Sequence, residues 1–319
     1  MSDVNLKIQK DMPLAQYTSF KIGGPARFFI LIKKPEELSQ AFAWAKEKKL
    51  PVLILGGGSN VLMSDAGWPG LVVKISITGL QIKKLQATSY KLQVGAGEAT
   101  SAVAREVSKR GLKGMEWAVG IPGTFGGAIR GNAGAFRFDT AQVIKTVEVW
   151  RDGKIIKLSK DDCGFSYRNS FFKSKFKNDI ILSAELEMEQ GNPAEVQAQV
   201  KYFLDHRDKS QPKQSSAGCF FKNFAITDKT QILKQIGADH GLPEEFIKHK
   251  KIPAGWLVEQ AGLKGTQVGQ AQVSTIHGNF IINLGGATAK DVLALVKKIK
   301  KEVKNRLGVD LEEEVQIVR

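Results

Sequence analysis

The most constraining feature of the sequence is one dense run of small residues, GIPGTFGGAIRGNAGA, over residues 120–135. Glycine and alanine fill most of it, so we expect a loop that contributes little to a packed core. Glycine tolerates positive φ and lets the backbone approach a bulky group closely. The run therefore predicts a backbone cradle for a large, flat ligand.

A second run, LGGGSN, occupies residues 55–60. Both runs also contain hydroxyl and amide side chains, Ser59 and Asn60 in one, Thr124 and Asn132 in the other. Neither fits the Rossmann or P-loop pattern. Backbone N–H groups in such loops form concave sites for anions. The two runs together predict a ligand with phosphates and a planar group.

The composition limits the class of protein. A chain of 319 residues is long enough for two or three domains. The sequence shows neither a signal peptide nor an apolar stretch that could span a membrane, so we expect a cytoplasmic protein. Its cysteines, Cys163 and Cys219, are too few for a disulfide framework, and we expect no metal site.

The formal net charge of +15 indicates an anionic partner. Nucleic acid is one candidate, and small substrates with several phosphates are another. Many lysines fall on one expected helix near the C-terminus, where a solvated face is the simpler interpretation. No motif typical of nucleic-acid binding accompanies them, so we expect no nucleic-acid partner.

Hydrophobic periodicity predicts a mixture of helices and strands. A polar stretch with proline, residues 207–216, indicates a linker and a domain boundary. Helices are expected over 35–50, over 99–110, from 192 onward, and from Thr288 to Gly308. Strands are expected at 52–55, within 71–99, over 179–188 and over 309–318, and a hairpin of 146–150 and 154–158 is expected around Asp152-Gly153.

Several longer motifs follow one another in a specific order. They are YTSFKIGGPA (17–26), LGGGSNVL (55–62), GIPGTFGGAIRGNAGAF (120–136), FSYRNSFFK (165–173), SAGCFFKN (216–223), AGWLVEQAGLKG (254–265) and LEEEV (311–315). Together they resemble the UDP-N-acetylenolpyruvoylglucosamine reductases (UDP-N-acetylmuramate dehydrogenases) of peptidoglycan precursor synthesis. The resemblance covers nearly the whole chain.

The resemblance implies an α+β fold. It consists of an FAD-binding domain of the vanillyl-alcohol oxidase and p-cresol methylhydroxylase type and a smaller C-terminal α/β substrate domain. We expect an FAD-binding subdomain at 1–67, joined by a C-terminal strand at 306–319, a second at 68–209, and the substrate-binding domain at 210–305. The short separation of Arg168 and Cys219 resembles the subclass that lacks an extra tyrosine-bearing loop.

The resemblance also implies non-covalent FAD, NADPH as reductant and a UDP-sugar enol ether as substrate, all of which carry phosphates. It implies that the FAD pyrophosphate lies on Gly56, Gly57, Gly58, Ser59 and Asn60. It places the isoalloxazine and ribityl groups on Gly120, Pro122, Gly123, Thr124, Gly126, Gly127, Ala128, Ile129 and Gly134. Substrate contacts would come from Asn223, His277 and Gln211, and residues 224–252 receive no role.

The implied reaction transfers hydride from reduced FAD N5 to the CH₂ carbon of the enol ether, and the adjacent carbon is then protonated. A cation must meet the substrate carboxylate, for which Arg168 is the candidate, and Cys219 is the candidate proton donor. Without the resemblance, other interpretations of these residues stay open. Arg168 could form a surface ion pair, Cys219 could be a buried core thiol, and His277 could have a structural role.

The acid that shares the developing negative charge is expected to be one of the glutamates at 312–314, and the residues alone do not show which one. The family pattern Glu-Pro-Glu-Val-Arg maps its second glutamate onto Glu314. This chain departs from that pattern, because Glu313 replaces the proline and Gln316 the arginine.

Two other functions compete with the reductase. One is another non-covalent FAD oxidoreductase of the same superfamily, acting on a sugar or a phenol. Covalent flavin is disfavoured, because none of the four histidines lies in either glycine run. The other is a basic nucleic-acid-binding protein.

Overall fold

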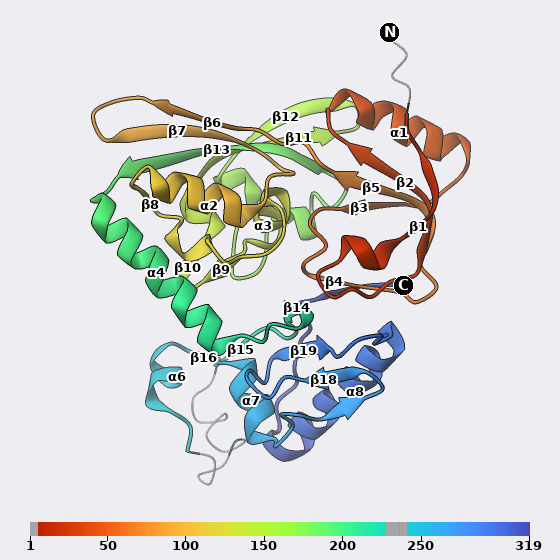
Figure 1. Cartoon of the computed structure of the whole chain (residues 1–319), viewed down its shortest axis with the longest axis vertical. Coiled ribbons are helices and arrows are strands. Elements are labelled where there is room, and N and C mark those ends of the chain that lie inside the picture. The colour runs from red at the N-terminus through yellow and green to blue at the C-terminus, as the bar shows by residue number, and fades with distance from the viewer. Residues whose placement is uncertain (1–5, 228–235, 237–240) are drawn as a thin grey trace. The chain divides into compact units, whose positions relative to one another are not determined.

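The computed structural model describes residues 6–227, 236 and 241–319 (Figure 1). The chain divides into two compact units. The first unit comprises Met1–Met12, Ala26–Gly58 and Trp68–Lys209, and the second comprises Pro13–Pro25, Ser59–Gly67 and Ser210–Arg319. The finer division at 67/68, 209/210 and 305/306 stays a prediction.

The first unit begins with a four-stranded sheet in the order β1-β2-β5-β3. Its strands are β1 (Gln9–Pro13), β2 (Pro25–Ile32), β5 (Trp68–Ile75) and β3 (Val52–Leu55), and β2, β5 and β3 are parallel. The predicted first helix is α1 (Glu36–Glu47), whose buried Leu38 and Ala41 join the same core as Val73 of β5. β2, α1 and β3 thus form a crossover that ends at the first glycine run.

A six-stranded antiparallel sheet forms the rest of the first unit, in the order β12-β11-β13-β7-β6 with β8 on β13. Asp152 and Gly153 both have positive φ (49° and 85°) and join β11 to β12, so the predicted hairpin is confirmed. The strands are β6 (Leu80–Lys84), β7 (Ser89–Gly95), β8 (Leu112–Lys113), β11 (Ile144–Arg151), β12 (Lys154–Ser159) and β13 (Ile180–Gln190).

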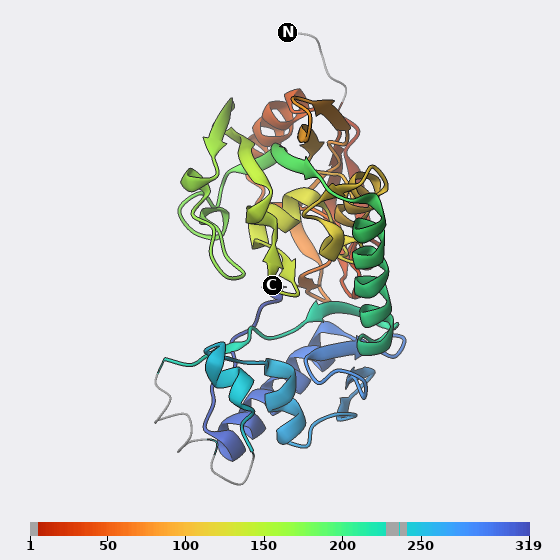
Figure 2. The ribbon, with the colours of Figure 1, turned by 90° about the vertical axis from the view of Figure 1, so that its left-hand side faces the viewer.

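Helices α2 (Thr100–Lys109), α3 (Phe125–Gly131) and α4 (Pro193–Ser210) accompany this sheet, and Figure 2 shows α4 following directly on β13. The predicted helices at 99–110 and from 192 onward are confirmed. A small hairpin, β9 (Gly134–Ala135) and β10 (Phe138–Asp139), follows α3. Short 3₁₀ turns complete both units: Leu14–Tyr17, Glu116–Ala118, Thr140–Gln142, Asp161–Cys163 and Phe171–Lys173.

The expectation that the run at 120–135 contributes little to the core was wrong. Its middle forms α3, and Phe125 and Ile129 on this helix are completely buried in the core of the first unit. Two large apolar side chains a helical turn apart are enough to anchor a short helix whose other residues are small. The glycine content therefore hid a helix.

The second unit contains a four-stranded sheet in the order β14-β19-β18-β17 and the parallel pair β20-β4. Its strands are β4 (Val61–Met63), β14 (Ser215–Cys219), β15 (Phe224–Ala225), β16 (Lys251–Ile252), β17 (Gln267–Val268), β18 (Ala271–Val273), β19 (Phe280–Asn283) and β20 (Gln316–Val318), and its helices are α6 (Glu244–Lys248), α7 (Ala254–Gln260) and α8 (Ala289–Leu307).

α8 begins and ends as predicted. The Thr288 hydroxyl accepts from the Asp291 N–H (3.0 Å) and the Asp291 carboxylate accepts from the Thr288 N–H (3.0 Å), which is a capping box. Gly308 closes the helix with φ of 69°. The predicted linker at 207–216 is shorter than expected, because α4 continues to Ser210.

The predicted strand at 309–318 was also wrong in its extent, because only Gln316–Val318 are a strand. Val309, Leu311 and Val315 are buried, so the alternating pattern does mark the inward side chains. The preceding residues instead contact the irregular segment 220–222, through one isolated bridge between Phe221 and Glu313. An irregular partner cannot supply the ladder that a long strand needs.

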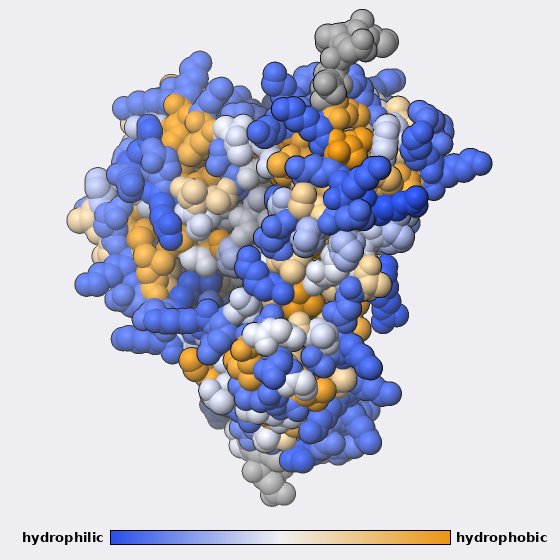
Figure 3. Space-filling view, turned by 45° about the vertical axis from the view of Figure 1, so that its right-hand side comes forward, coloured by the Kyte–Doolittle hydropathy of each residue, from blue (hydrophilic) through white to orange (hydrophobic). Residues whose placement is uncertain are grey.

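Among the described residues, no helix has the length and apolar character needed to cross a membrane. The face drawn in Figure 3 is mostly hydrophilic, with apolar side chains in small separate groups.

The capping box gives a first prediction. Replacing Thr288 by alanine removes the acceptor for the Asp291 N–H and lowers the free energy of unfolding by about 1 kcal/mol. Urea unfolding followed by circular dichroism measures the change. Thr88→Ala at an exposed position is the control, with an effect within about 0.5 kcal/mol. Equal effects of the two variants would contradict the role of the cap.

Candidate active site

The two glycine runs meet within the first unit. The Gly57 N–H donates to Thr124 Oγ1 (3.2 Å). A Cβ added to Gly57 would lie 2.5 Å from the Gly123 Cα, and one added to Gly56 would lie 2.7 Å from Thr124 Oγ1. Since real Cβ atoms do not come so close, these positions require glycine for the two loops to form one continuous cradle.

Packing explains further glycines of the second run. The Gly126 N–H donates to the Ala96 carbonyl (2.9 Å), and a Cβ on Gly126 would lie 2.9 Å from the Ala96 Cβ. A Cβ on Gly134 would lie 2.3 Å from the Phe138 carbonyl oxygen. Gly126 and Gly134 are therefore needed by the fold itself, whatever ligand approaches them.

Two basic side chains accompany the cradle. Lys74 on β5 donates through Nζ to the Gly56 carbonyl (2.7 Å), and burial lowers the pKa of Lys74. Arg130 on α3 has a buried Nη1 for which no hydrogen-bond partner exists among the described residues, and burial lowers the pKa of Arg130. Buried positive charge needs an anionic or strongly polar partner.

These observations fit FAD. The joined loops offer backbone to a planar group, and the Lys74 ammonium beside Gly56 suits a pyrophosphate. Arg130, with its buried Nη1, lies at the other end of α3. The sequence analysis missed Lys74, although a lysine within the apolar stretch LVVKIS was a usable signal. Of the predicted pyrophosphate contacts, Gly56–Gly58 belong to the first unit, whereas Ser59 and Asn60 belong to the second.

Arg168 lies in a tight turn of the first unit. Ser166 and Asn169 exchange backbone hydrogen bonds (3.0 and 3.1 Å), which leaves Tyr167 and Arg168 at the tip. Arg168 has a φ of 54°, a conformation that residues other than glycine, asparagine and aspartate seldom adopt. Its side chain is half-buried.

Cys219 ends β14 in the second unit, opposite Phe280 of β19. The pairing shifts register between Ser216 and Cys219, and Gly218 there has a φ of 79°. Such a bulge redirects the following side chain. Cys219 is half-buried and is followed by two buried phenylalanines, Phe220 and Phe221.

The segment after Cys219 is held by Asn279, which the sequence analysis missed. The buried Asn279 side chain accepts from the Phe221 N–H and donates to the Phe221 carbonyl, each at 2.8 Å, while its own carbonyl accepts from the Phe220 N–H. The only signal for Asn279 in the sequence is its position directly after His277-Gly278, near the end of a loop.

Glu314 lies beside this segment. Its N–H donates to the Phe220 carbonyl (2.8 Å), and its carbonyl accepts from Asn60 Nδ2 (3.1 Å). Glu312 instead forms an ion pair with Lys222, and Glu313 forms one with Lys300 at 2.8 Å. The fold thus brings Glu314 and Asn60 to the residue that follows Cys219.

The remaining candidates also belong to the second unit. Asn223 Oδ1 accepts from the Ala254 N–H (3.1 Å) at the start of α7, which is a structural contact. Gln211 directly follows α4. His277 Nδ1 accepts from the Asn279 N–H (3.1 Å), and the ring packs against Phe280 at 5.0 Å.

His277 therefore stands as a neutral imidazole with its proton on Nε2. Burial lowers its pKa and Lys264 adds to this effect, while Glu259 partly opposes it. A neutral ring whose Nδ1 accepts a hydrogen bond presents Nε2–H as a donor. Such a donor suits a carbonyl or phosphate oxygen.

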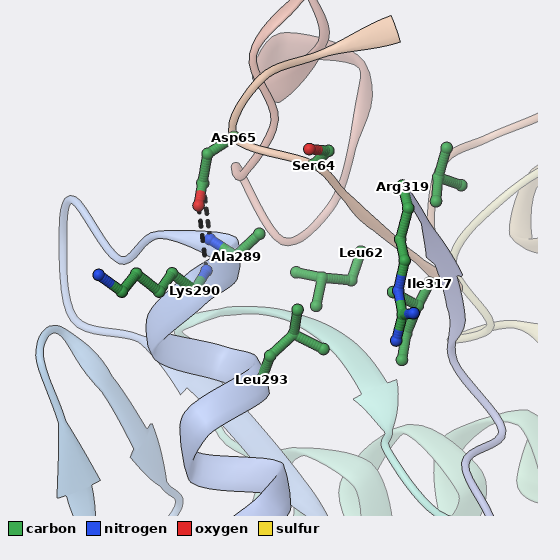
Figure 4. A pocket seen from close by; sticks show the side chains of 9 residues that line it. Leu62, Ser64, Asp65, Ala289, Lys290, Leu293, Ile317 and Arg319 are labelled. Atoms are coloured by element: carbon green, nitrogen blue, oxygen red, sulfur yellow. Dashed lines mark hydrogen bonds between the residues drawn. The ribbon is translucent and has the colours of Figure 1, made fainter.

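A separate pocket of about 250 Å³ lies beside the start of α8 (Figure 4). None of the predicted site residues lines it. Its Asp65 carboxylate accepts from the N–H groups of Ala289 and Lys290 (2.7 and 3.0 Å), as the dashed lines in Figure 4 show. Asp65 is thus engaged in holding the first turn of α8 in the second unit.

Comparison with known proteins gives a consistent result. Residues 211–318 match the family model "UDP-N-acetylenolpyruvoylglucosamine reductase, C-terminal domain", and residues 26–159 match an FAD binding domain. The chain is 38% identical to the UDP-N-acetylenolpyruvoylglucosamine reductase of Synechococcus sp. (strain WH7803) over 97% of this chain and 92% of that protein. It is 37% identical to that of Bacillus velezensis, over 98% and 94% respectively.

The fold agrees as well. The crystal structure of UDP-N-acetylenolpyruvylglucosamine reductase from Thermus caldophilus is similar with a TM-score of 0.75 and 31% identity, and 99% of each chain is covered. The predicted α+β fold, an FAD-binding domain followed by a smaller C-terminal domain, is therefore confirmed.

The buried His277 gives a second prediction. Because its pKa is lower in the folded protein, the unfolded chain binds more protons below the ordinary histidine pKa. The wild type therefore loses stability relative to His277→Asn as the pH falls from 7 to 5, and above that range the difference is constant. Urea unfolding across this range measures it. Parallel stability curves for the two proteins would contradict a neutral buried His277.

Proposed function

The chain belongs to the UDP-N-acetylenolpyruvoylglucosamine reductases, FAD-dependent oxidoreductases of peptidoglycan synthesis that use NADPH, and from this premise we propose that Arg168, Cys219 and Glu314 perform its chemistry. The substrate is accordingly a UDP-sugar, UDP-N-acetylglucosamine enolpyruvate, and the product is UDP-N-acetylmuramate. We further propose that the protein acts in the cytoplasm. The observation on which the roles chiefly rest is the placement of Glu314 against the segment that follows Cys219.

FAD, when bound, would supply the redox chemistry of the reaction, namely hydride transfer from NADPH to the enol-ether CH₂ carbon. The residues proposed to hold FAD are those of the joined glycine runs, with Lys74 near its phosphates. Gly56, Gly57 and Gly123 bring the two loops close enough to act as one surface.

Arg168 would bind the substrate carboxylate. A guanidinium offers two parallel N–H donors to a carboxylate, and a planar cation stabilises negative charge that develops on it. Arg168 lies at the tip of the tight turn that Ser166 and Asn169 close.

Cys219 would protonate the carbon next to the one that receives the hydride. A thiol that donates a proton has to be neutral at rest, and the proposal agrees with the apolar, buried residues that follow it in the chain, Phe220 and Phe221. The bulge at Gly218 explains how a residue at a strand end can point out of the regular ladder.

Glu314 would share the negative charge as a hydrogen-bonding acid. Its backbone is held on both sides, by Phe220 and by Asn60. Glu312 and Glu313 form ion pairs with Lys222 and Lys300, and the choice of Glu314 among the three follows from the family pattern, which maps its second glutamate onto this position. The glutamate that replaces the family proline thus has a structural use in its pair with Lys300.

Spectroscopy tests the function directly, and this is a third prediction. The purified protein is yellow, anaerobic NADPH bleaches its flavin absorbance, and UDP-N-acetylglucosamine enolpyruvate restores it. UDP-N-acetylglucosamine, which lacks the enol ether, is the control and restores nothing. Bleaching without recovery would keep a flavin enzyme and refute the substrate, whereas a protein that takes up no FAD would refute the cradle.

Cys219 gives a fourth prediction. Cys219→Ala keeps FAD and its reduction by NADPH, but reoxidation by the enolpyruvyl substrate slows ~10²–10⁴-fold, because the proton donor is lost. Cys219→Ser keeps substantial activity, since a hydroxyl can donate the same proton. Stopped-flow absorbance separates the two half-reactions. Near-normal reoxidation of the alanine variant would refute the assignment.

A further inference from the structure

We propose that Asn132 is a positioning residue for Arg168, through the turn of residues 166–169, which we call the arginine turn. The inference rests on the role proposed above for Arg168. Asn132 belongs to the second glycine run, where its amide was first interpreted as part of a ligand cradle. The structure shows a different use for this side chain.

The Asn132 side chain is almost fully buried, at 3% exposure, and its hydrogen-bonding groups face the protein. Nδ2 donates to the Ser166 carbonyl (3.0 Å) and to Asp139 Oδ2 (3.2 Å), and Oδ1 accepts from the Ala141 N–H (3.0 Å). Asn132 therefore connects the end of α3 with residues 139–141 and with Ser166, and it uses both ends of its amide.

The hydrogen bond from Asn132 Nδ2 to the Ser166 carbonyl connects Asn132 with the arginine turn. Ser166 is the first residue of the arginine turn, and its carbonyl already accepts from the Asn169 N–H that closes the turn. The turn has to keep Arg168 at a φ of 54°, which a residue of this type does not favour. An additional buried hydrogen bond at the closing carbonyl stabilises that conformation.

Two further contacts hold the same turn. Lys173 Nζ donates to the Arg168 carbonyl (2.6 Å), and the buried Ser170 hydroxyl donates to the Arg130 carbonyl (2.7 Å). Asn132 and Arg130 both lie at the end of α3, so two of the three anchors of the turn come from this short helix.

The other end of α3 begins at the glycine cradle, because Thr124 is its N-cap and also contacts Gly57. A helix of seven residues is about 10 Å long. α3 and Asn132 together therefore fix the distance between the proposed flavin loops and the proposed carboxylate-binding cation. Asparagine suits the junction, because it tolerates the left-handed φ of 41° found there.

The test uses the full-length, FAD-loaded enzyme. Asn132→Asp keeps the acceptor for the Ala141 N–H but loses the donor to the Ser166 carbonyl, and Asn132→Gly, which keeps the left-handed backbone, serves if aspartate beside Asp139 prevents folding. We expect normal FAD content and normal reduction by NADPH, but reoxidation by UDP-N-acetylglucosamine enolpyruvate about 10²-fold slower, as a displaced catalytic group gives.

The matched control is Thr140→Val. The buried Thr140 hydroxyl donates to the Ala133 carbonyl (2.9 Å) in the same region, and not to a group of the arginine turn. We expect it to lower the melting temperature like the Asn132 variants while leaving both half-reactions unchanged. Equal slowing of reoxidation by Thr140→Val would overturn the inference, because general loosening would then explain the effect.

A double-mutant cycle with Arg168→Ala completes the test. If Asn132 acts through Arg168, Asn132→Asp slows reoxidation less than two-fold when Arg168 is already absent. If instead the reoxidation rate of the double variant falls by the product of the two single-variant factors, the inference is overturned. If Arg168→Ala itself reoxidises at the wild-type rate, the proposed role of Arg168 fails, and the inference fails with it. If Arg168→Ala slows reoxidation but the Asn132 variants reoxidise at the wild-type rate, the inference fails and the proposed role of Arg168 stands.

Discussion

The first unit depends on the contact at which residues 56–57 meet residues 123–124. Only backbone and one threonine hydroxyl fit there, since any Cβ on Gly56 or Gly57 would collide with the opposite loop. The first loop is the end of a parallel β-α-β crossover, and the second is the start of α3. Their contact therefore sets the position of α3, and through Asn132 that of the arginine turn.

The second unit has a comparable constraint in its backbone bonds. The C-terminal strand β20 pairs in parallel with β4, and Asn60 at the start of β4 bonds both Gln316 and Glu314. Asn60 and β4, which lie in the first fifth of the chain, thus hold Glu314 and β20 near its C-terminal end. Gln316 takes part in this arrangement through its backbone N–H, which donates to the Asn60 carbonyl.

Local patterns predicted local structure well. The Asp152-Gly153 hairpin and the capping box of Thr288 depend on neighbours in sequence, and both form as expected. The order of motifs along the chain likewise sufficed for the family. In contrast, α3 was missed because its stability depends on burying its own Phe125 and Ile129 in a core whose other members lie far away in sequence. The strand at 309–318 was overestimated because its partner is irregular.

The same distinction holds for the candidate site. Arg168, Cys219 and Glu314 were found by motif, and their roles stay predictions. The hydrogen-bond partners of Asn132, Asn279 and Lys74 could not be predicted from sequence, because the fold alone decides which group faces an amide or an ammonium. Asn279, for instance, contacts Phe221, which lies far from it in the chain.

Buried charge in the first unit is best understood together with its ligand. A guanidinium removed from water without a partner costs several kcal/mol, and the fold would gain by replacing it with an apolar residue. Arg130 nevertheless has a buried Nη1 that no described residue accepts from, on the helix that begins at the glycine cradle. An anionic or polar group of a bound ligand would supply the missing partner, so the protein without its ligands is expected to be the less stable form.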